Sequence, residues 1–533
     1  MRAAAAVFQD PRARTLPAIL ERAAADWGDK PLVLFDDMVV SYRDLWERAR
    51  LFAGALAALG VRPRDTVAIL LSNRWEYLEV WWGICLLGAV EVPVNFGLKG
   101  KLLEHVLKDS EAALCITEAA FLPELEPVLA QVPALQRLIV VDERAEAVGG
   151  RPALAFRDLP RQASDLPALR YGDLAGIMYT SGSTGAAKGV MLSHNYFLRF
   201  GEEKARHLRT GPSDVIHNCY PLFNASGQFE AVMAAMSVGA TVYQAPRFSA
   251  SRFWQEIRQH RCTEFIYMGG ILSLLDKQPA RADDADNPVR AGYGVPTPVD
   301  LHPRFEQRFG CVLVEVYGST EANTVTFNPY DARKWGSCGL PTAGYEVRLV
   351  DADDNPVGPG EVGEMLVRPT RAHSILEGYW RQPQRTAEVF GGLWYRTGDL
   401  LRADEDGYHF FVGRKGDTVR HRGYTFAASQ VEEVVNGFPE VLESAVVGIA
   451  SDSGEDDLKL LFVARGAPDP EALRRRCERE LPAWMVPRYI ELREGLPKTP
   501  TQKIEKYRLR QEGVTPATID FGAYRPRQPG REA

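Results

Sequence analysis

The stretch YTSGSTGAAKGVMLSH, residues 179–194, decides how the rest of this chain is interpreted. A short apolar run, LAGIMY, leads into it, and the apolar VML returns near its end. Between them, glycines let the backbone come close to a ligand, while hydroxyls and one lysine supply hydrogen-bond donors and a positive charge. Loops of this kind are typical of phosphate cradles. The predicted phosphate-binding residues are Thr180, Ser181, Gly182, Ser183, Thr184, Gly185 and Lys188.

This loop differs from the Walker P-loop, in which Gly-Lys is followed directly by Ser or Thr. Here Lys188 stands between Ala187 and Gly189. The alternative interpretation is a flexible Ser/Gly linker. The strand-like run before the loop and the hydrophobic return after it argue against that alternative.

A second group of polar residues follows another apolar run. The run VLVEVY, residues 312–317, predicts a buried strand, and GSTE, residues 318–321, comes at its carboxyl end. Open α/β sheets bind their ligands at that edge. A strand that ends in Ser-Thr-Glu is common in itself. The pattern becomes specific only because it follows the phosphate loop in the chain.

Length and composition indicate a globular protein with more than one core, since the chain has 533 residues, of which 45% are hydrophobic and 25% charged. The net charge of −7 argues against a nucleic-acid-binding protein, which would normally carry an excess of basic residues. The 7 cysteines lack CxxC spacing, which argues against a zinc site and favours a reducing compartment. We find no pattern of a signal peptide, and VWWGICLLGAV, residues 80–90, is too short for a bilayer and predicts a buried helix. We therefore expect a cytoplasmic protein without a membrane span.

Apolar runs in the first part of the chain alternate between strand-like and helical patterns, which predicts α/β layers with mostly parallel strands. A β-rich segment follows at residues 335–369, where turn residues separate two strand-like runs. The expected strands are residues 66–72, 113–117, 137–142, 346–351 and 363–369, and an expected helix covers residues 45–60.

Taken in order, these stretches resemble the adenylate-forming superfamily of acyl-CoA synthetases, peptide-synthetase adenylation domains and luciferases. The runs YRTGDL, GRKGD, RHRGYTF and PKTPTQKIEK add to the resemblance and are most similar to those of carnitine-CoA-ligase-like acyl-CoA ligases. The similarity extends over about residues 15–510. It implies an α/β fold with a large N-terminal domain of layered sheets and a small β-barrel subdomain (residues 1–415), a small mobile α+β C-terminal domain (residues 416–512) and a loosely ordered tail (residues 513–533).

The resemblance also implies roles for individual residues around ATP and Mg²⁺. Tyr317 would stack on adenine, Thr320 would meet the α-phosphate and Glu321 would hold Mg²⁺, which suits a hard oxygen ligand. In the C-terminal part, Lys503 would be the adenylation lysine, Gly416 the hinge, and Gly423 and Tyr424 part of the channel for the second substrate. The remaining residues implied at ATP are Gly294, Val295, Pro296, Gly318, Asp399 (on the ribose) and Arg414.

The pocket for the acid is implied in the same way, with Phe223, Asn224, Gly269, Gly270 and Thr324 as its main residues, beside Gly292 and Tyr293. We expect a strand to end at residues 221–224 and a helix to begin after Ser226 and Gly227. Asn224 departs from the family, which usually has His or an aromatic residue at this position. Asn224 either has a changed gating role or caps the helix that follows. Tyr424, Thr425 and Gln430 also depart from the usual pattern, on the face that would form the thioester.

The function implied is ATP-dependent activation of a small or aromatic carboxylic acid as acyl-AMP, with release of pyrophosphate, followed by thioester formation with CoA. One alternative is a diazotase of the same fold, which activates nitrite and diazotises an aromatic amine in secondary metabolism. A second is an adenylation enzyme that loads a carrier protein. A non-catalytic relative is disfavoured because the phosphate loop, Glu321, Asp399, Arg414 and Lys503 are all present. The sequence leaves the oligomeric state open, a homodimer included.

Overall fold

The computed structural model describes residues 10, 13–36, 38–142, 146–180, 187–415, 418–421, 424–450, 456–466, 468–498 and 504–522. The chain divides into two compact units. The larger lies within Met1–Gly182, Ala186–Val347 and Val367–Tyr395. The smaller lies mainly within Arg348–Leu366 and Arg396–Ala533.

The larger unit contains a nine-stranded sheet whose strand order is β17-β16-β15-β14-β13-β11-β12-β1-β2. The pairs from β1 through β12, β11, β13 and β14 to β15 are parallel, so the carboxyl ends of these strands share one edge. The strands are β1 (Pro31–Leu34), β2 (Val39–Ser41), β11 (Val215–Asn218), β12 (Thr241–Gln244), β13 (Glu264–Met268), β14 (Ala291–Val295), β15 (Val312–Ser319), β16 (Asn323–Phe327) and β17 (Leu340–Pro341).

A second nine-stranded sheet has the order β20-β10-β9-β4-β3-β5-β6-β8-β7 and is parallel from β9 through β4, β3, β5 and β6 to β8. Its strands β3, β5 and β6 confirm three of the predicted strands. The strands are β3 (Thr66–Leu70), β4 (Val90–Pro93), β5 (Leu114–Thr117), β6 (Arg137–Val140), β7 (Ala147–Val148), β8 (Arg151–Ala155), β9 (Leu174–Thr180), β10 (Lys188–Ser193) and β20 (Gly378–Tyr379).

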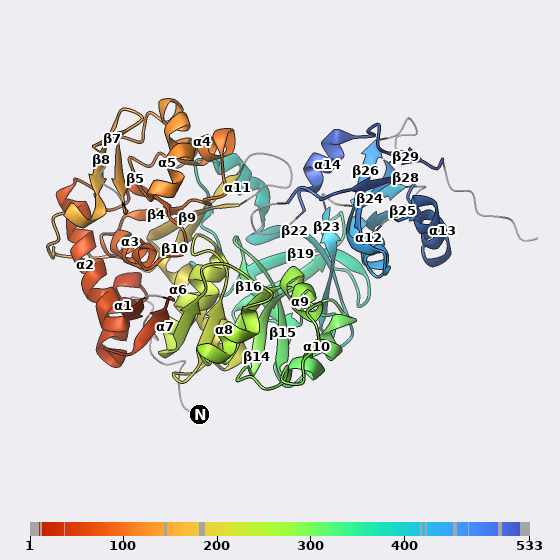
Figure 1. Ribbon diagram of the computed structural model, residues 1–533, viewed down its shortest axis with the longest axis horizontal. Helices are drawn as coiled ribbons and strands as arrows, with labels where there is room; N and C mark the ends of the chain where they lie inside the picture. Colours follow the sequence, from red (N-terminus) through yellow and green to blue (C-terminus); the bar gives the residue numbers. More distant parts are fainter. Residues whose placement is uncertain are drawn as a thin grey trace, which may run out of the picture. The chain divides into compact units, whose positions relative to one another are not determined.

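Helices flank and separate these two sheets. Helix α6 contacts β10 of the second sheet as well as β14 and β16 of the first, so it lies between them (Figure 1). The helices and helical turns of the larger unit are α1 (Leu16–Trp27), α2 (Tyr42–Ala58), α3 (Trp75–Leu86), α4 (Gly100–Asp109), η3 (Ala119–Phe121), α5 (Leu122–Leu125), η4 (Glu126–Gln131), η5 (Phe156–Asp158), α6 (His194–Leu208), the π-helix η6 (Ser226–Met233), α7 (Ala234–Val238), α8 (Phe253–Gln259), α9 (Gly269–Asp276), α10 (Leu301–Phe309) and α11 (Pro383–Val389).

Local sequence explains two of these helices. Ser41 and Asp44 form a capping box at the start of α2, which satisfies backbone N–H groups that a helix leaves free. In α3, Trp81 and Trp82 are fully buried, which confirms the buried helix predicted for the most apolar run of the chain. Within the described residues no helix is long and apolar enough to cross a membrane.

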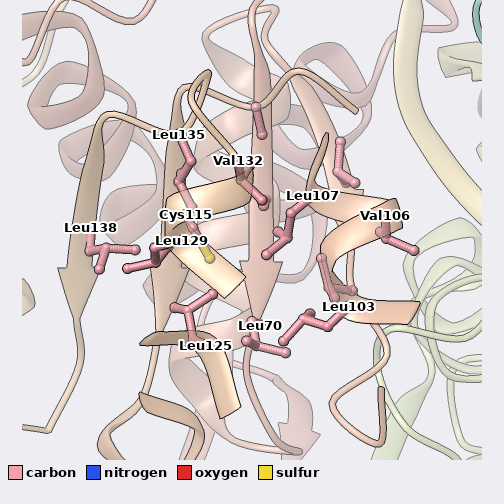
Figure 2. Close-up of a cluster of buried hydrophobic side chains, with 14 of the residues drawn as sticks. Leu70, Leu103, Val106, Leu107, Cys115, Leu125, Leu129, Val132, Leu135 and Leu138 are labelled. Atoms are coloured by element: carbon pink, nitrogen blue, oxygen red, sulfur yellow. The ribbon is translucent and has the colours of Figure 1, made fainter. Parts of the chain in front are cut away.

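Aliphatic side chains from α4, α5 and the helical turn η4 cover one face of the second sheet. Leu103 and Leu107 of α4 and Leu129 of η4 pack with Leu70 and Cys115 from the strands (Figure 2). Each such leucine contributes about 1.5–3 kcal/mol when it leaves water. This core holds the strands that lead to the loop between β9 and β10.

The limits of the two units fall within strands of a five-stranded sheet of order β18-β19-β22-β21, with β23 beside β22. The smaller unit also contains the pair β24-β25 and a sheet of order β26-β27-β28-β29. The bounds are β18 (Tyr345–Val350), β19 (Val362–Pro369), β21 (Phe390–Gly391), β22 (Trp394–Ala403), β23 (His409–Arg414), β24 (Thr418–His421), β25 (Tyr424–Ala427), α12 (Ala428–Asn436), β26 (Val441–Ala450), β27 (Asp456–Ala464), α13 (Pro470–Glu480), β28 (Tyr489–Arg493), α14 (Lys506–Glu512) and β29 (Ile519–Asp520).

Most predicted elements agree with the structure, including the strands expected at β18 and β19. The strand expected to end at residues 221–224 is wrong, because β11 ends at Asn218 and a turn follows it. Pro221 lies in this turn, and its carbonyl accepts a hydrogen bond from the Asn224 N–H (3.0 Å). The helix begins at Ser226 and includes Gly227, so it starts earlier than predicted.

Candidate active site

The carboxyl ends of the parallel strands β13, β14 and β15 bring several predicted residues of the larger unit together. Strand β13 ends at Met268, which is in register with Val295 at the end of β14. Gly294 is in turn in register with Glu315 of β15. Ligands bind at this edge of open α/β sheets. The structure therefore places the adenine-side residues and the acid-pocket residues on adjacent strand ends of one sheet.

A tight hairpin between β15 and β16 presents Thr320 and Glu321. Ser319 pairs with Asn323 across it, and the Ser319 hydroxyl accepts a hydrogen bond from the Ala322 N–H (3.1 Å). The phenol of Tyr196 donates to the carbonyl of Thr320 (2.8 Å). With its backbone fixed in this way, the turn leaves the Thr320 and Glu321 side chains partly exposed.

Two glycines at the strand ends are required by close backbone contacts. A Cβ at Gly294 would lie 1.8 Å from the carbonyl oxygen of Tyr267, and a Cβ at Gly318 would lie 2.2 Å from that of Asn323. Any side chain would push the neighbouring strands apart. These glycines were predicted to contact nucleotide, and the structure gives them in addition a role in packing β14 and the hairpin.

The segment around β20 connects Glu321 to the strands that flank the phosphate loop. The Tyr379 phenol donates a hydrogen bond to Glu321 Oε1 (3.2 Å), and the N–H of Leu376 donates to the Glu321 carbonyl (2.7 Å). The Lys188 ammonium lies 4.9 Å from the centre of the Tyr379 ring. Tyr379 thus touches both the predicted metal ligand and the predicted phosphate-binding lysine, although the sequence analysis did not select it or Tyr196.

The geometry around Glu321 fits a magnesium ion. Its carboxylate is partly exposed, and Tyr379 orients it through one oxygen. The described residues contain no group of three or more His, Cys, Asp or Glu side chains that could hold a metal. A single carboxylate suffices for Mg²⁺ when substrate phosphates and waters supply the other ligands.

The predicted acid pocket combines buried aromatic and hydroxyl groups. The Tyr293 phenol donates to the Thr324 hydroxyl (3.4 Å) and lies 3.1 Å from His207 Nδ1. Burial holds the pKa of His207 well below its usual value, so this imidazole is neutral. Phe223 is buried with its ring edge-on to Phe96.

Two further pocket predictions have a clear structural context. The Asn224 side chain accepts a hydrogen bond from the Ser226 N–H (3.1 Å), so Asn224 does stabilise the start of η6. Gly270, in the first turn of α9, is exposed, and a Cβ there would meet nothing within 4 Å. Gly270 therefore leaves room beside the end of β13.

Glu230 belongs to this region but was missed by the sequence analysis. It lies on η6, a π-helix, a form often found at functional sites. Burial raises the pKa of its carboxyl to about 7. Its signal in the sequence was a single acidic residue in an otherwise uncharged run, GQFEAVMAAM.

In the smaller unit, Asp399 and Arg414 lie opposite each other on β22 and β23. The Arg414 Nε donates to the buried Asp399 carboxylate (3.0 Å). The Thr397 hydroxyl accepts from the Asp399 N–H (3.0 Å) and donates to the carbonyl of Met365 (2.8 Å). The predicted ribose ligand is therefore held in one orientation.

Several predicted site residues lie outside the described residues: Ser181, Gly182, Ser183, Thr184, Gly185, Gly416, Gly423 and Lys503. Tyr424 is described only by its backbone, in β25. Their roles stay predictions, as does the domain boundary after residue 415.

Comparison with protein families gives two matches. Residues 20–380 match the model of the AMP-binding enzyme family, and residues 430–503 match the model of the AMP-binding enzyme C-terminal domain. The chain belongs to this family. The resemblance to adenylate-forming enzymes and the prediction of an ATP-dependent, AMP-forming ligase are thereby confirmed, and Mg²⁺ is typical of these enzymes.

Curated relatives and solved structures agree with that assignment. The crotonobetaine/carnitine–CoA ligase of Salmonella paratyphi B is 30% identical over 506 residues, which cover 91% of this chain and 97% of the relative. The structure of the anthranilate CoA ligase AuaEII with anthranoyl-AMP has a TM-score of 0.85 at 26% identity and covers 96% of this chain and 99% of that chain. The benzoate CoA ligase from Burkholderia xenovorans LB400 has a TM-score of 0.81 at 27% identity and covers 93% and 99%. The predicted fold class, with a large N-terminal and a smaller C-terminal domain, is confirmed.

Proposed function

We propose that this enzyme activates a small or aromatic carboxylic acid as its acyl adenylate and then transfers the acyl group to CoA. The observation that carries the proposal is the β15–β16 turn, where Tyr196 and Tyr379 fix Thr320 and Glu321. Tyr293 and Thr324, two residues of the predicted acid pocket, are hydrogen-bonded to each other on the neighbouring strands. Relatives that act on crotonobetaine or carnitine, anthranilate and benzoate support an acid of this size.

In the first step, a carboxylate oxygen of the acid attacks the α-phosphorus of ATP, and the bond to pyrophosphate breaks. Negative oxygens surround that phosphorus, so positioning and charge neutralisation provide most of the catalysis. The Thr320 hydroxyl donates to the α-phosphate, Tyr317 offers its ring to adenine, and Lys188 with the loop before it binds the leaving phosphates. Glu321 would hold Mg²⁺, which neutralises phosphate charge when bound.

The resemblance implies further contacts of the first step from Asp399 and Lys503. The Asp399 carboxylate can accept hydrogen bonds from both ribose hydroxyls. Lys503 would contribute a positive charge. In the second step the CoA thiol attacks the acyl carbonyl and AMP leaves, with rotation about Gly416 bringing Gly423 to the site.

The test is Mg-ATP-dependent pyrophosphate release with a panel of small and aromatic acids, with and without CoA. Pyrophosphate, AMP and a thioester are expected. A parallel reaction contains nitrite and aminoaromatic acids without CoA, and a third contains a carrier protein with its phosphopantetheine arm. Pyrophosphate release only in the nitrite reaction would indicate a diazotase, and release only in the carrier-protein reaction would indicate a carrier-loading enzyme. Either result would replace the proposal.

Lys503→Ala tests the assignment of the first step. The variant should lose pyrophosphate release by at least about a hundredfold, because it removes a charge that acts on the transition state. Folding and ATP binding should persist. Near-normal release in this variant would contradict the role of Lys503.

A further inference from the structure

Glu230 lies on η6, the helix that comes after two residues of the predicted acid pocket. Its helix η6 packs against β11 and β13 and follows the turn that carries Phe223 and Asn224. The preceding residue, Phe229, is fully buried against the aromatic rings of α6. Glu230 differs from Phe229 in remaining partly exposed as a residue.

Three buried tyrosines are within electrostatic range of this carboxyl. Burial raises the pKa of Tyr196, Tyr220 and Tyr293, and the charge of Glu230 adds to each shift. Tyr293 is the pocket residue that binds Thr324, and Tyr220 lies next to the turn at Pro221. Glu230 is therefore near Tyr293, a predicted pocket residue, and lies on the helix that follows the turn with two others.

None of the residues that the structure describes forms an ion pair with Glu230. The Ser226 hydroxyl, one helical turn earlier, favours the charged form of the carboxyl and so lowers its pKa somewhat. The positive charge that reaches it belongs to Lys204, whose ammonium is fully buried in an ion pair with Glu264. Arg290 also binds Glu264 but in addition pairs with Asp214, so this four-residue group is neutral without Glu230.

The other charged groups on α6 are likewise engaged. Glu203 pairs with Arg199 and Arg206, and His207 is neutral. Burying a carboxylate costs free energy unless a cation pairs with it or hydrogen-bond donors satisfy its oxygens. A bound molecule with a positive charge or N–H groups would supply what the protein does not.

We propose that Glu230 is a specificity-determining residue that selects acids bearing a nitrogen group, either a neutral amino group that donates N–H bonds or a cationic group. The inference rests on the proposed function, since it names the class of acid for the same pocket. The carboxylate of the acid would be activated at the β15–β16 turn, while its nitrogen group would bind Glu230. Acids of the same shape that carry carbon in place of nitrogen would leave the Glu230 carboxylate unpaired.

Matched pairs of acids test this directly. Each aminobenzoate is compared with the corresponding methylbenzoate, and 4-(trimethylammonio)butanoate with 5,5-dimethylhexanoate. Binding to the full-length protein is measured by isothermal titration calorimetry, and kcat/KM by pyrophosphate release. For at least one pair, the wild type should prefer the nitrogen acid by about tenfold or more, because loss of one partner from a buried charged pair has a large effect.

Three variants distinguish a selective role from a structural one. Glu230→Gln should reduce the preference to near unity, Glu230→Asp should retain much of it, and Glu47→Gln, an exposed carboxylate on α2, should not change it. Unfolding curves verify that each variant is folded. An unchanged preference in Glu230→Gln, or a wild type that prefers no nitrogen acid, would overturn the inference.

The two proposals fail in different ways. Preferential binding of a nitrogen acid that depends on Glu230, without thioester formation, would retain the inference and reject the proposed function. Thioester formation with both members of each pair at equal efficiency would retain the function and reject the inference.

Discussion

The β15–β16 turn and the helix η6 border the same sheet edge but differ in how their polar groups are satisfied. In the turn, the carbonyls of Thr320 and Glu321 accept hydrogen bonds from Tyr196 and the Leu376 N–H, and Tyr379 donates to the Glu321 carboxylate. On η6, the charged form of the Glu230 carboxyl is favoured by the Ser226 hydroxyl and by Lys204, which is already paired with Glu264.

This difference matches the ligands that each region would bind. The turn would serve ATP, which is the same in every turnover, so the protein can orient its groups in advance. The pocket would bind the acid. A buried polar group that has no partner in the protein discriminates strongly between acids that pair with it and acids that leave it unpaired. Four changes test this contrast.

Glu321→Gln should have the largest effect. It keeps the shape and the contact with Tyr379 but removes the charge that would hold Mg²⁺. We expect kcat for pyrophosphate release to fall by roughly 10²–10³-fold, the usual cost of losing one group that stabilises the transition state. Measurement over a range of Mg²⁺ concentrations checks this, and a variant with wild-type rate and Mg²⁺ dependence would remove Glu321 from the site.

Glu230→Gln should stabilise the protein in a manner that depends on pH. The pKa of Glu230 is raised from 4.5 to about 7, so folding takes up a proton between these values and the wild type loses stability as pH rises through that window. Glutamine avoids this loss. The variant should gain roughly 2–4 °C in Tm above pH 7 and nothing near pH 4.5.

Thermal unfolding at pH 4.5, 6 and 8, with Glu47→Gln as control, measures this gain. A variant that is less stable than the wild type at pH 8 would show that other groups of the protein stabilise the Glu230 carboxylate. The contrast between the two regions would then disappear.

Tyr379→Phe should have a smaller effect on the turn. The ring that lies beside Lys188 remains, and only the hydrogen bond to Glu321 is lost. We expect a loss of about tenfold in activity, which corresponds to one hydrogen bond to a charged group. The loss should appear mainly as a weaker apparent affinity for Mg²⁺, because Tyr379 positions Glu321, and a change in kcat alone at saturating Mg²⁺ would contradict this role.

Asn224→Ala should have the smallest effect. It removes the acceptor for the Ser226 N–H at the start of η6, which should cost about 1 kcal/mol of unfolding free energy. If Asn224 only stabilises the helix, the midpoint of urea unfolding moves to a lower urea concentration, and the rates of both half-reactions stay near normal. A selective loss of thioester formation, with normal pyrophosphate release, would show a gating role instead.

Much of the nucleotide side could be predicted from sequence because it depends on local runs. A strand followed by GSTE, or a glycine-rich loop between two strands, has the same local geometry wherever it occurs, and β9, β10 and β15 lie where these patterns placed them. The error at residues 221–224 has a physical reason as well. The apolar side chains of Leu222 and Phe223 are buried in a turn, and burial alone does not distinguish a turn from a strand.

The sequence by itself determined the family, the α/β layers and the chemistry of the turn, because each depends on residues that are neighbours in the chain. Only the tertiary structure decided which distant groups complete them. Tyr379 meets Glu321 across 58 positions, and Lys204 meets Glu264 across 60. Whether Glu230 has a partner depends on such pairings, since a carboxylate is neutralised or left free by whatever the fold brings to it.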